Sequence, residues 1–166
     1  MHTPKVEQMK TVLVVLGSGG HTAEMLRLVD MLGPKYRYVF LLSDDDEASA
    51  EKVKRRIRLK VRRPTKRGWG LGKTLGSILK SFFQSHKLIS DTKFDMIVGC
   101  GPGICIFPMF FARLRGKKVV FVETLSRVHT HSWTGRMMYK FADLFYVQWK
   151  EQLERYPKAI YRGRLL

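Results

Sequence analysis

Short apolar runs alternate along the chain with segments in which apolar residues recur at helical spacing. The runs predict strands at residues 11–16, 36–42, 57–61, 94–99, 119–122 and 144–147. The helical segments predict helices at residues 21–32, 46–56, 75–89, 104–115, 133–142 and 149–156. Strands that alternate with helices form a parallel sheet with helices on its faces. The sequence therefore predicts an α/β fold, with a Rossmann-like parallel sheet and flanking helices, that binds ligands at the carboxyl ends of its strands.

The length and composition fit one domain. A chain of 166 residues with 45% hydrophobic residues can form one core of ordinary size. We expect residues 1–10 to be an N-terminal tail and residues 11–166 to form a single Rossmann-like domain. No stretch approaches the roughly 18 to 20 apolar residues of a membrane-spanning helix, so a soluble or peripheral protein is expected. The two cysteines, Cys100 and Cys105, lie in or beside apolar runs, which predicts two buried thiols.

The loop after the first predicted strand is rich in glycine. It reads Gly17-Ser18-Gly19-Gly20-His21-Thr22, and a predicted helix begins within it. Glycines let the backbone approach a phosphate closely, and the first N–H groups of the helix can bind that phosphate. The dinucleotide fingerprint G-x-G-x-x-G would need glycine at Thr22, which weakens a nicotinamide site, and a turn that is merely tight is the plain alternative. The helix dipole disfavours a charged His21, which favours a neutral imidazole that can accept a proton.

Two further loops follow predicted strands. The turn Gly101-Pro102-Gly103 opens the next helix and can form a second anion-binding turn. The polar loop from Glu123 to Ser132 also carries Arg127, which predicts the lip of a site, with an ordinary solvated loop as the alternative. The two histidines of this loop lack a third ligand at suitable spacing, so no metal is expected. No other cofactor is predicted.

Two other patterns do not carry the chemistry that they suggest. Asp44-Asp45-Asp46 contains the D-x-D of many metal-dependent sugar transferases, but it directly precedes a predicted helix, where aspartates cap the N-terminus. Gly72-Lys73-Thr74 looks like the end of a P-loop, but the first glycine of that motif would fall on Arg67. We therefore interpret the aspartates as a helix cap and reject the P-loop.

Five sequence motifs follow one another along the chain: GSGGHTAEMLRL, GCGPGICIFP, VVFVETLSRV, WTGRMMYKFADLFYVQW and YPKAIYRGRLL. Together they resemble the asparagine-linked glycosylation protein fourteen family, the acceptor-side, membrane-anchoring subunit of a split UDP-N-acetylglucosamine transferase. The first and third are also similar to the acceptor domain of the bacterial lipid-linked N-acetylglucosaminyltransferase of peptidoglycan synthesis. The resemblance implies the N-terminal, acceptor half of a GT-B glycosyltransferase.

The resemblance also implies a reaction and a partner. A donor-binding subunit would supply UDP-GlcNAc, and the pair would add GlcNAc with inversion to a polyprenyl (dolichyl) diphosphate-linked GlcNAc in N-glycan precursor synthesis. This chain alone would be inactive. The candidate catalytic residues are His21 and Glu123, with either as the general base. The candidate acceptor-diphosphate-binding residues are Gly17, Ser18, Gly19, Gly20, Thr22, Gly101, Pro102, Gly103 and Arg127.

Charge concentrates in one segment. The formal net charge is +17, and residues 52–90 contain thirteen Lys and Arg but no Asp or Glu. Such an excess indicates an anionic partner, and a basic segment binds an anionic leaflet. The candidate membrane-facing residues are Arg62, Arg63, Lys66, Arg67, Trp69 and Lys73. The Phe82 and Phe83 pair could anchor in the interface or belong to the core.

The membrane assignment leaves alternatives. Eukaryotic members of the family carry an N-terminal anchor, so either the anchor was removed or this is a prokaryotic or archaeal relative that docks peripherally. The expected location is the cytoplasmic face of the endoplasmic reticulum or of a prokaryotic plasma membrane. A nucleotide-binding oxidoreductase and a basic nucleic-acid module rank lower. No nucleic-acid partner is expected, because Trp69 is the only aromatic residue for base stacking among the closely spaced basic residues of 52–73.

Overall fold

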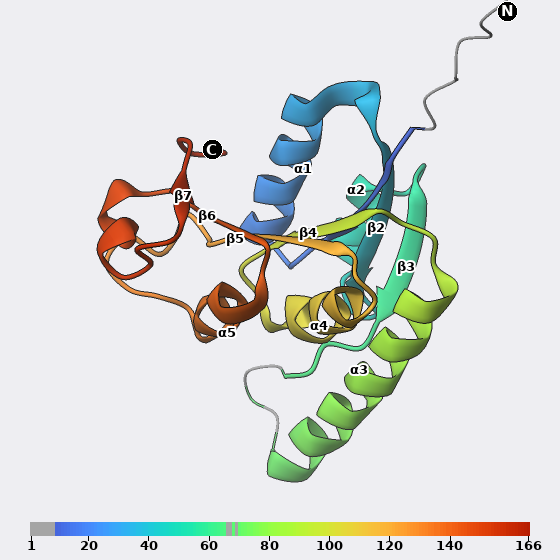
Figure 1. Ribbon diagram of the computed structural model, residues 1–166. Coiled ribbons are helices and arrows are strands. Elements are labelled where there is room, and N and C mark those ends of the chain that lie inside the picture. Colours follow the sequence, from blue (N-terminus) through green and yellow to red (C-terminus); the bar gives the residue numbers. More distant parts are fainter. Residues whose placement is uncertain (1–8, 66–67, 69) are drawn as a thin grey trace, which may run out of the picture.

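The fold is a parallel sheet between two layers of helices (Figure 1). The computed structural model describes residues 9–65, 68 and 70–166. Within them seven strands form one sheet in the order β3-β2-β1-β4-β5-β6-β7, and each neighbouring pair is parallel. The strands are β1 Thr11–Val15, β2 Arg37–Ser43, β3 Ile57–Val61, β4 Met96–Cys100, β5 Lys118–Val122, β6 Leu144–Val147 and β7 Ile160–Tyr161. The predicted α/β fold with a Rossmann-like parallel sheet is confirmed.

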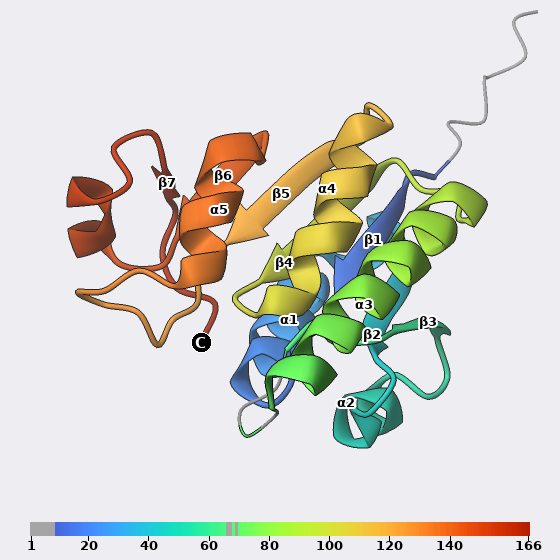
Figure 2. The same cartoon turned by 90° about the horizontal axis from the view of Figure 1, so that it is seen from below.

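Helices cover both faces of this sheet (Figure 2). The α-helices are α1 Gly20–Leu32, α2 Glu47–Lys52, α3 Leu71–Asp91, α4 Ile106–Leu114 and α5 Trp133–Phe141. The 3-10 helices are η1 Gly33–Lys35, η2 Gly103–Cys105 and η3 Lys150–Glu154. In β1, Val12 and Val14 face the core under α1 and α2, whereas Leu13 and Val15 face the core under α3, α4 and α5. Each central strand is therefore apolar on both faces, as a buried parallel strand must be.

The C-terminal part of the chain departs from the prediction. The helix expected at residues 149–156 is wrong, because the structure has only the short 3-10 helix η3 there. Gln152 in η3 is buried and donates from Nε2 to the carbonyl oxygens of Arg127 and Thr130, so contacts with a distant loop fix this segment. The sequence pattern also gave no indication of β7, which has two residues that pair with the end of β6. A strand this short leaves no alternating pattern to detect.

Helix α3 buries a face that the apolar pattern does not indicate. Its buried residues are Ser77, Ser81, Ser85 and Ile89, which recur every four residues. Small side chains let α3 lie close beside α4 (Figure 2). A second row with the same spacing stays exposed: Leu71 at 88%, Leu75 at 58%, Leu79 at 52% and Phe83 at 66%. The N-terminal half of this helix also projects away from the sheet (Figure 1).

Phe82 and Phe83 have different environments. Phe82 is partly buried against the core and meets the rings of Phe107 and Phe111 edge to face, with centroids 5.5 and 4.9 Å away. Phe83 remains exposed. The sequence allows this pair to be either an interface anchor or part of the core. Phe82 belongs to the core, and of the two only Phe83 is available to bind a surface. Cys100 and Cys105 are both buried free thiols, as predicted.

Candidate active site

Two glycine loops meet at the carboxyl edge of the sheet. A Cβ built on Gly17 would overlap the ring of Pro102, and a Cβ built on Gly101 would overlap the imidazole of His21. Gly101 also has φ +77°, a backbone conformation that residues with a side chain rarely adopt. The loop after β1 and the turn after β4 are therefore in contact, and His21 is enclosed between them.

The backbone of the first loop is open to solvent. Ser18, Gly19 and Gly20 are exposed, and Gly20 begins α1, whose first N–H groups have no partner within the helix. This end of a helix of 13 residues offers N–H groups and a positive dipole to an anion. Thr22 differs, since its side chain is buried and its hydroxyl contacts the Gly17 carbonyl oxygen and the Ser49 hydroxyl. Thr22 therefore shapes the loop from inside.

Burial lowers the pKa of His21. The imidazole is half-buried, and desolvation disfavours its charged form, whereas the negative charges of Glu24 and Glu123 oppose this effect and Arg127 adds to it. Since the ordinary value is 6.5, the ring is neutral at pH 7. A neutral imidazole has a free lone pair, so His21 is suited to accept a proton.

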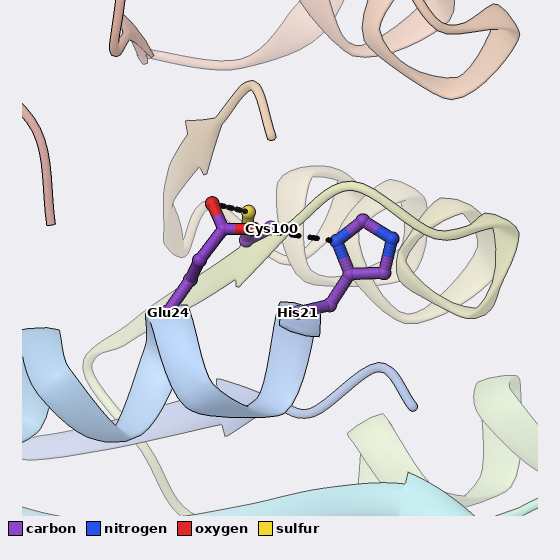
Figure 3. Close-up of side chains that lie close together, drawn as sticks. All are labelled: His21, Glu24 and Cys100. Atoms are coloured by element: carbon purple, nitrogen blue, oxygen red, sulfur yellow. Dashed lines mark hydrogen bonds and ion pairs between the residues drawn. The ribbon is translucent and has the colours of Figure 1, made fainter. Parts of the chain in front are cut away.

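Glu24 is a buried residue of this site that the sequence pattern did not indicate. It lies one turn after His21 on α1, is 3% exposed, and its Oε1 is 3.8 Å from His21 Nδ1 (Figure 3). Its carboxylate accepts hydrogen bonds from Cys100 Sγ, Thr124 Oγ1, the Leu125 N–H and Gln148 Nε2. One buried carboxylate thus joins α1 to the ends of β4, β5 and β6.

Three potential metal ligands lie together here. The ligand atoms of His21, Glu24 and Cys100 are all within 4.8 Å of one another. Burial and the Glu24 carboxylate raise the pKa of Cys100 well above its ordinary value, so the thiol keeps its proton and donates it to Glu24. In this structure the three side chains belong to the hydrogen-bonded network around Glu24.

Glu123 lies at the end of β5 and is fully buried. Its carboxylate accepts hydrogen bonds from Ser132 Oγ at 3.0 Å and from Tyr156 Oη at 3.1 Å. Gly135 in α5 leaves the space that this carboxylate fills. Ser132 in turn caps α5 through its bond from the Gly135 N–H at 2.7 Å. Glu123 therefore links the loop that follows β5 to α5 and to Tyr156, two residues after η3.

The remaining candidate residues divide between the edge of the site and the surface. Pro102 and Gly103 are half-buried beside the first loop, and they line a small pocket with Ser18 and Arg63. Arg127 is exposed on the loop after β5 and donates to Thr130 Oγ1. This arrangement leaves both glycine turns and the Arg127 side chain on one edge of the sheet.

Two of the predicted membrane-facing arginines make ion pairs at this same edge. Arg62 Nη1 is 3.6 Å from Asp44 Oδ2, and Arg63 Nε is 2.7 Å from Asp45 Oδ1. Lys73 is exposed on α3. Lys66, Arg67 and Trp69 lie outside the described residues. Among the residues described, none of the helices combines the length and hydropathy that crossing a bilayer would require.

The predicted cap at the start of α2 is confirmed. Asp46 is the N-cap residue, and its Oδ1 accepts a hydrogen bond from the Ser49 N–H at 3.1 Å. The aspartates of the D-x-D pattern thus serve two structural purposes. Asp46 caps the helix, and Asp44 and Asp45 pair with arginines.

Comparison with known proteins gives one family over nearly the whole chain. Residues 12–165 match the family model described as oligosaccharide biosynthesis protein Alg14 like. The UDP-N-acetylglucosamine transferase subunit ALG14 of Homo sapiens is 36% identical over 94% of this chain and 83% of that protein. The protein of the same name from Yarrowia lipolytica is 32% identical over 100% and 85%.

Solved structures share the fold at low identity. MurG of Acinetobacter baumannii superposes with a TM-score of 0.70 at 20% identity, over 86% of this chain and 42% of MurG. A UDP-N-acetylglucosamine 2-epimerase from Rickettsia bellii gives a TM-score of 0.68 at 11% identity, over 95% of this chain and 46% of the epimerase. The chain therefore spans less than half the length of these structures.

Proposed function

Because the chain belongs to the Alg14 family, we propose that it is the acceptor-binding subunit of a two-protein, inverting N-acetylglucosaminyltransferase. The donor is UDP-GlcNAc, and the acceptor is a polyprenyl diphosphate-linked GlcNAc. The names of the human and Yarrowia relatives support this proposal. The observation that carries it is a neutral His21 enclosed at the helix N-terminus that the glycine loop exposes.

The exposed loop suits an acceptor that carries a diphosphate. The diphosphate accepts hydrogen bonds from the first N–H groups of α1, next to Ser18, Gly19 and Gly20. Arg127 supplies a positive charge from the loop after β5. An acceptor held there places its sugar hydroxyl beside the His21 imidazole.

His21 acts as the general base in this mechanism. The acceptor hydroxyl oxygen attacks the anomeric carbon of the donor from the face opposite UDP, and the carbon–oxygen bond to UDP breaks with its electron pair on the leaving phosphate. The hydroxyl proton passes to His21, and the new glycosidic bond has inverted configuration. A base whose pKa lies below 6.5 is mostly neutral at pH 7 and is therefore suited to this step.

We assign Glu123 to the support of the site. A base must reach the proton that it removes, but this carboxylate is fully buried and already accepts hydrogen bonds from two hydroxyl groups. Its position instead fixes the loop that carries Arg127. Glu123 therefore ranks below His21 as the base.

A second subunit would complete the site. The chain corresponds to less than half of each solved structure that it resembles. An apolar groove runs between α1 and the C-terminal segment, lined by Leu28, Met31, Val120, Leu144 and Leu165 among others. Burying such a surface is favourable. We assign this groove to the donor-binding partner.

Helix α3 provides the contact with the membrane. Its exposed row from Leu71 to Phe83 lies on a helix that also carries Lys73, Lys80 and Lys87 on its surface. Apolar residues enter the headgroup region, and lysines attract an anionic leaflet, so an amphipathic helix of this kind lies in the interface. This docking places the acceptor site near its lipid-linked substrate at the cytoplasmic face.

Reconstitution tests the proposed function. Purified chain, UDP-GlcNAc and a polyprenyl diphosphate-linked GlcNAc should give no disaccharide until a donor-binding subunit is added, because one half of the cleft cannot align both reactants. Product is measured by mass spectrometry of the lipid-linked sugar. Turnover by this chain alone would overturn the split-enzyme assignment, and no turnover with the partner would overturn the reaction.

A further inference from the structure

Glu24 is a buried carboxylate that the mechanism above does not use. It follows His21 by one turn of α1, and Oε1 lies at ion-pair distance from His21 Nδ1. Figure 3 shows one ring nitrogen of His21 turned toward Glu24 and the other turned away. The two nitrogens therefore have different surroundings, with Nδ1 facing a carboxylate and Nε2 facing away from it.

The hydrogen bonds of Glu24 leave its charge available to His21. Oε2 accepts from Cys100 Sγ at 3.2 Å, from the Leu125 N–H at 3.0 Å and from Gln148 Nε2. Oε1, which faces His21, accepts from the Thr124 hydroxyl at 3.0 Å. All of these donors are neutral groups, so they orient the carboxylate without cancelling its charge.

The nitrogen on the inner side of the His21 ring makes no hydrogen bond. This atom, Nδ1, is buried and has no hydrogen-bond partner among the described residues. The other charges that act on the ring are Glu123, which favours the imidazolium, and Arg127, which opposes it. A positive charge that formed on the ring would have Glu24 as its ion-pair partner.

We propose that Glu24 is a positioning residue that stabilises the imidazolium formed when His21 Nε2 takes the acceptor proton. The proposal rests on the assignment of His21 as the base. The proton arrives at Nε2, the positive charge spreads over the ring, and Nδ1–H then points at Glu24 Oε1. A carboxylate behind a catalytic histidine stabilises its charged form in the same way in other enzymes.

A histidine titration of the full chain tests this coupling without substrate or partner. The imidazole of His21 is followed by NMR against pH, and its signal is identified by its loss in His21→Asn. In Glu24→Gln the pKa of His21 should fall, because burial still disfavours the imidazolium and the opposing charge is gone. A site that had merely loosened would gain water, and the pKa would rise toward 6.5. The sign therefore separates an electrostatic role from a structural one.

Two further variants make the test decisive. Cys100→Ala removes a donor to Glu24 but keeps its charge, so the pKa of His21 should not fall. If Glu24→Gln does not fold, Glu24→Asp withdraws the charge by one methylene and should lower the pKa as well. In the assembled enzyme, Glu24→Gln should lower kcat about tenfold and move the acid limb of the pH profile to lower pH. An unchanged or raised pKa in the folded variant overturns the proposal.

The results also distinguish this inference from the function on which it rests. If His21→Ala keeps normal turnover, the base assignment fails, and the catalytic role of Glu24 fails with it. If His21→Ala is inactive but Glu24→Gln leaves the His21 titration unmoved, only the role of Glu24 is overturned.

Discussion

At the scale of single residues, burial separates the two candidate bases. We expect His21→Ala to lower turnover of the assembled enzyme about 100-fold, the range that removal of a general base costs. The wild-type profile should lose activity as pH falls through a pKa below 6.5, because the protonated imidazole cannot accept a proton. This limb should be absent in His21→Ala. The measurement is kcat against pH with the partner present.

Glu123→Gln is the matched comparison. Its amide cannot accept hydrogen bonds at both positions, so Ser132 or Tyr156 loses a partner, at a cost of about 1–3 kcal/mol in stability. Turnover should fall only as far as the loop is displaced, and the acid limb should persist. If Glu123→Gln removes the limb and His21→Ala retains it, the assignment of the base is reversed.

Gly101 offers a second test at this scale. Gly101→Ala should destabilise the fold by at least about 1–2 kcal/mol, because a side chain is strained at its positive φ. The added Cβ also displaces the His21 ring, so turnover should fall further than stability alone explains. Gly116→Ala is the control, since Gly116 also has a positive φ, +69°, but nothing lies within 4 Å of an added Cβ. Thermal unfolding and kcat are compared for both variants, and equal effects would contradict the proposed close fit.

The sequence pattern pointed to His21 as a candidate but not to Glu24, for a physical reason. A glycine loop before a helix is a local signal, and it drew attention to His21 directly. Glu24 stands beside Met25 on the buried side of α1, and nothing nearby marks it as special. Its partners Cys100 and Gln148 are 76 and 124 residues away. Only the folded sheet brings them together.

At the scale of elements, α2 depends on its cap. Asp46→Ala should lower the free energy of unfolding by about 1 kcal/mol, because the Ser49 N–H loses its acceptor. Asp46→Asn should restore most of it, since asparagine caps almost as well. Urea unfolding of the chain measures both. Equal losses in the two variants would show that charge rather than capping matters.

Helix α3 gives a membrane prediction. Leu75→Glu with Leu79→Glu should lower the affinity for anionic vesicles at least about tenfold, since each leucine would otherwise transfer apolar surface into the interface. Leu114→Glu changes an exposed leucine of α4 and should have little effect. Binding is measured by sedimentation at several salt concentrations, and the wild-type affinity should fall as salt rises. Equal loss in the control would place the contact elsewhere.

The ends of helices and strands could be predicted where the hydrophobic period and the flanking turn residues indicated the same position. Phe40 and Leu42 in β2 lie in a continuous apolar run, so this strand was recognised. The buried face of α3 was not, because its packing uses Ser77, Ser81 and Ser85 while leucines face outward. Hydrophobic periodicity assumes that apolar residues face the core. In α3 the small serines face the core and the leucines face outward, so this assumption fails.

At the scale of the whole molecule, the groove beside α1 predicts where the partner binds. Met31 is 62% exposed at this groove, so Met31→Lys should leave the fold intact and weaken partner binding at least about fivefold. Ile57→Lys alters a residue of similar exposure, 57%, on the edge strand β3 and serves as the control. Affinities are measured by titration calorimetry with the purified partner. Unchanged affinity in Met31→Lys would remove the groove from the interface.

The hydrogen bonds of Glu24 also affect the order in which parts of the structure form during folding. Its donors belong to β4 and to the loops after β5 and β6, so its hydrogen bonds can form only after these strands have joined β1 in the sheet. Contacts between residues so distant in sequence are costly to close and tend to form late. Weakening them would speed unfolding and leave the folding rate nearly unchanged. The hydrogen bonds that hold the site in place would therefore form last during folding.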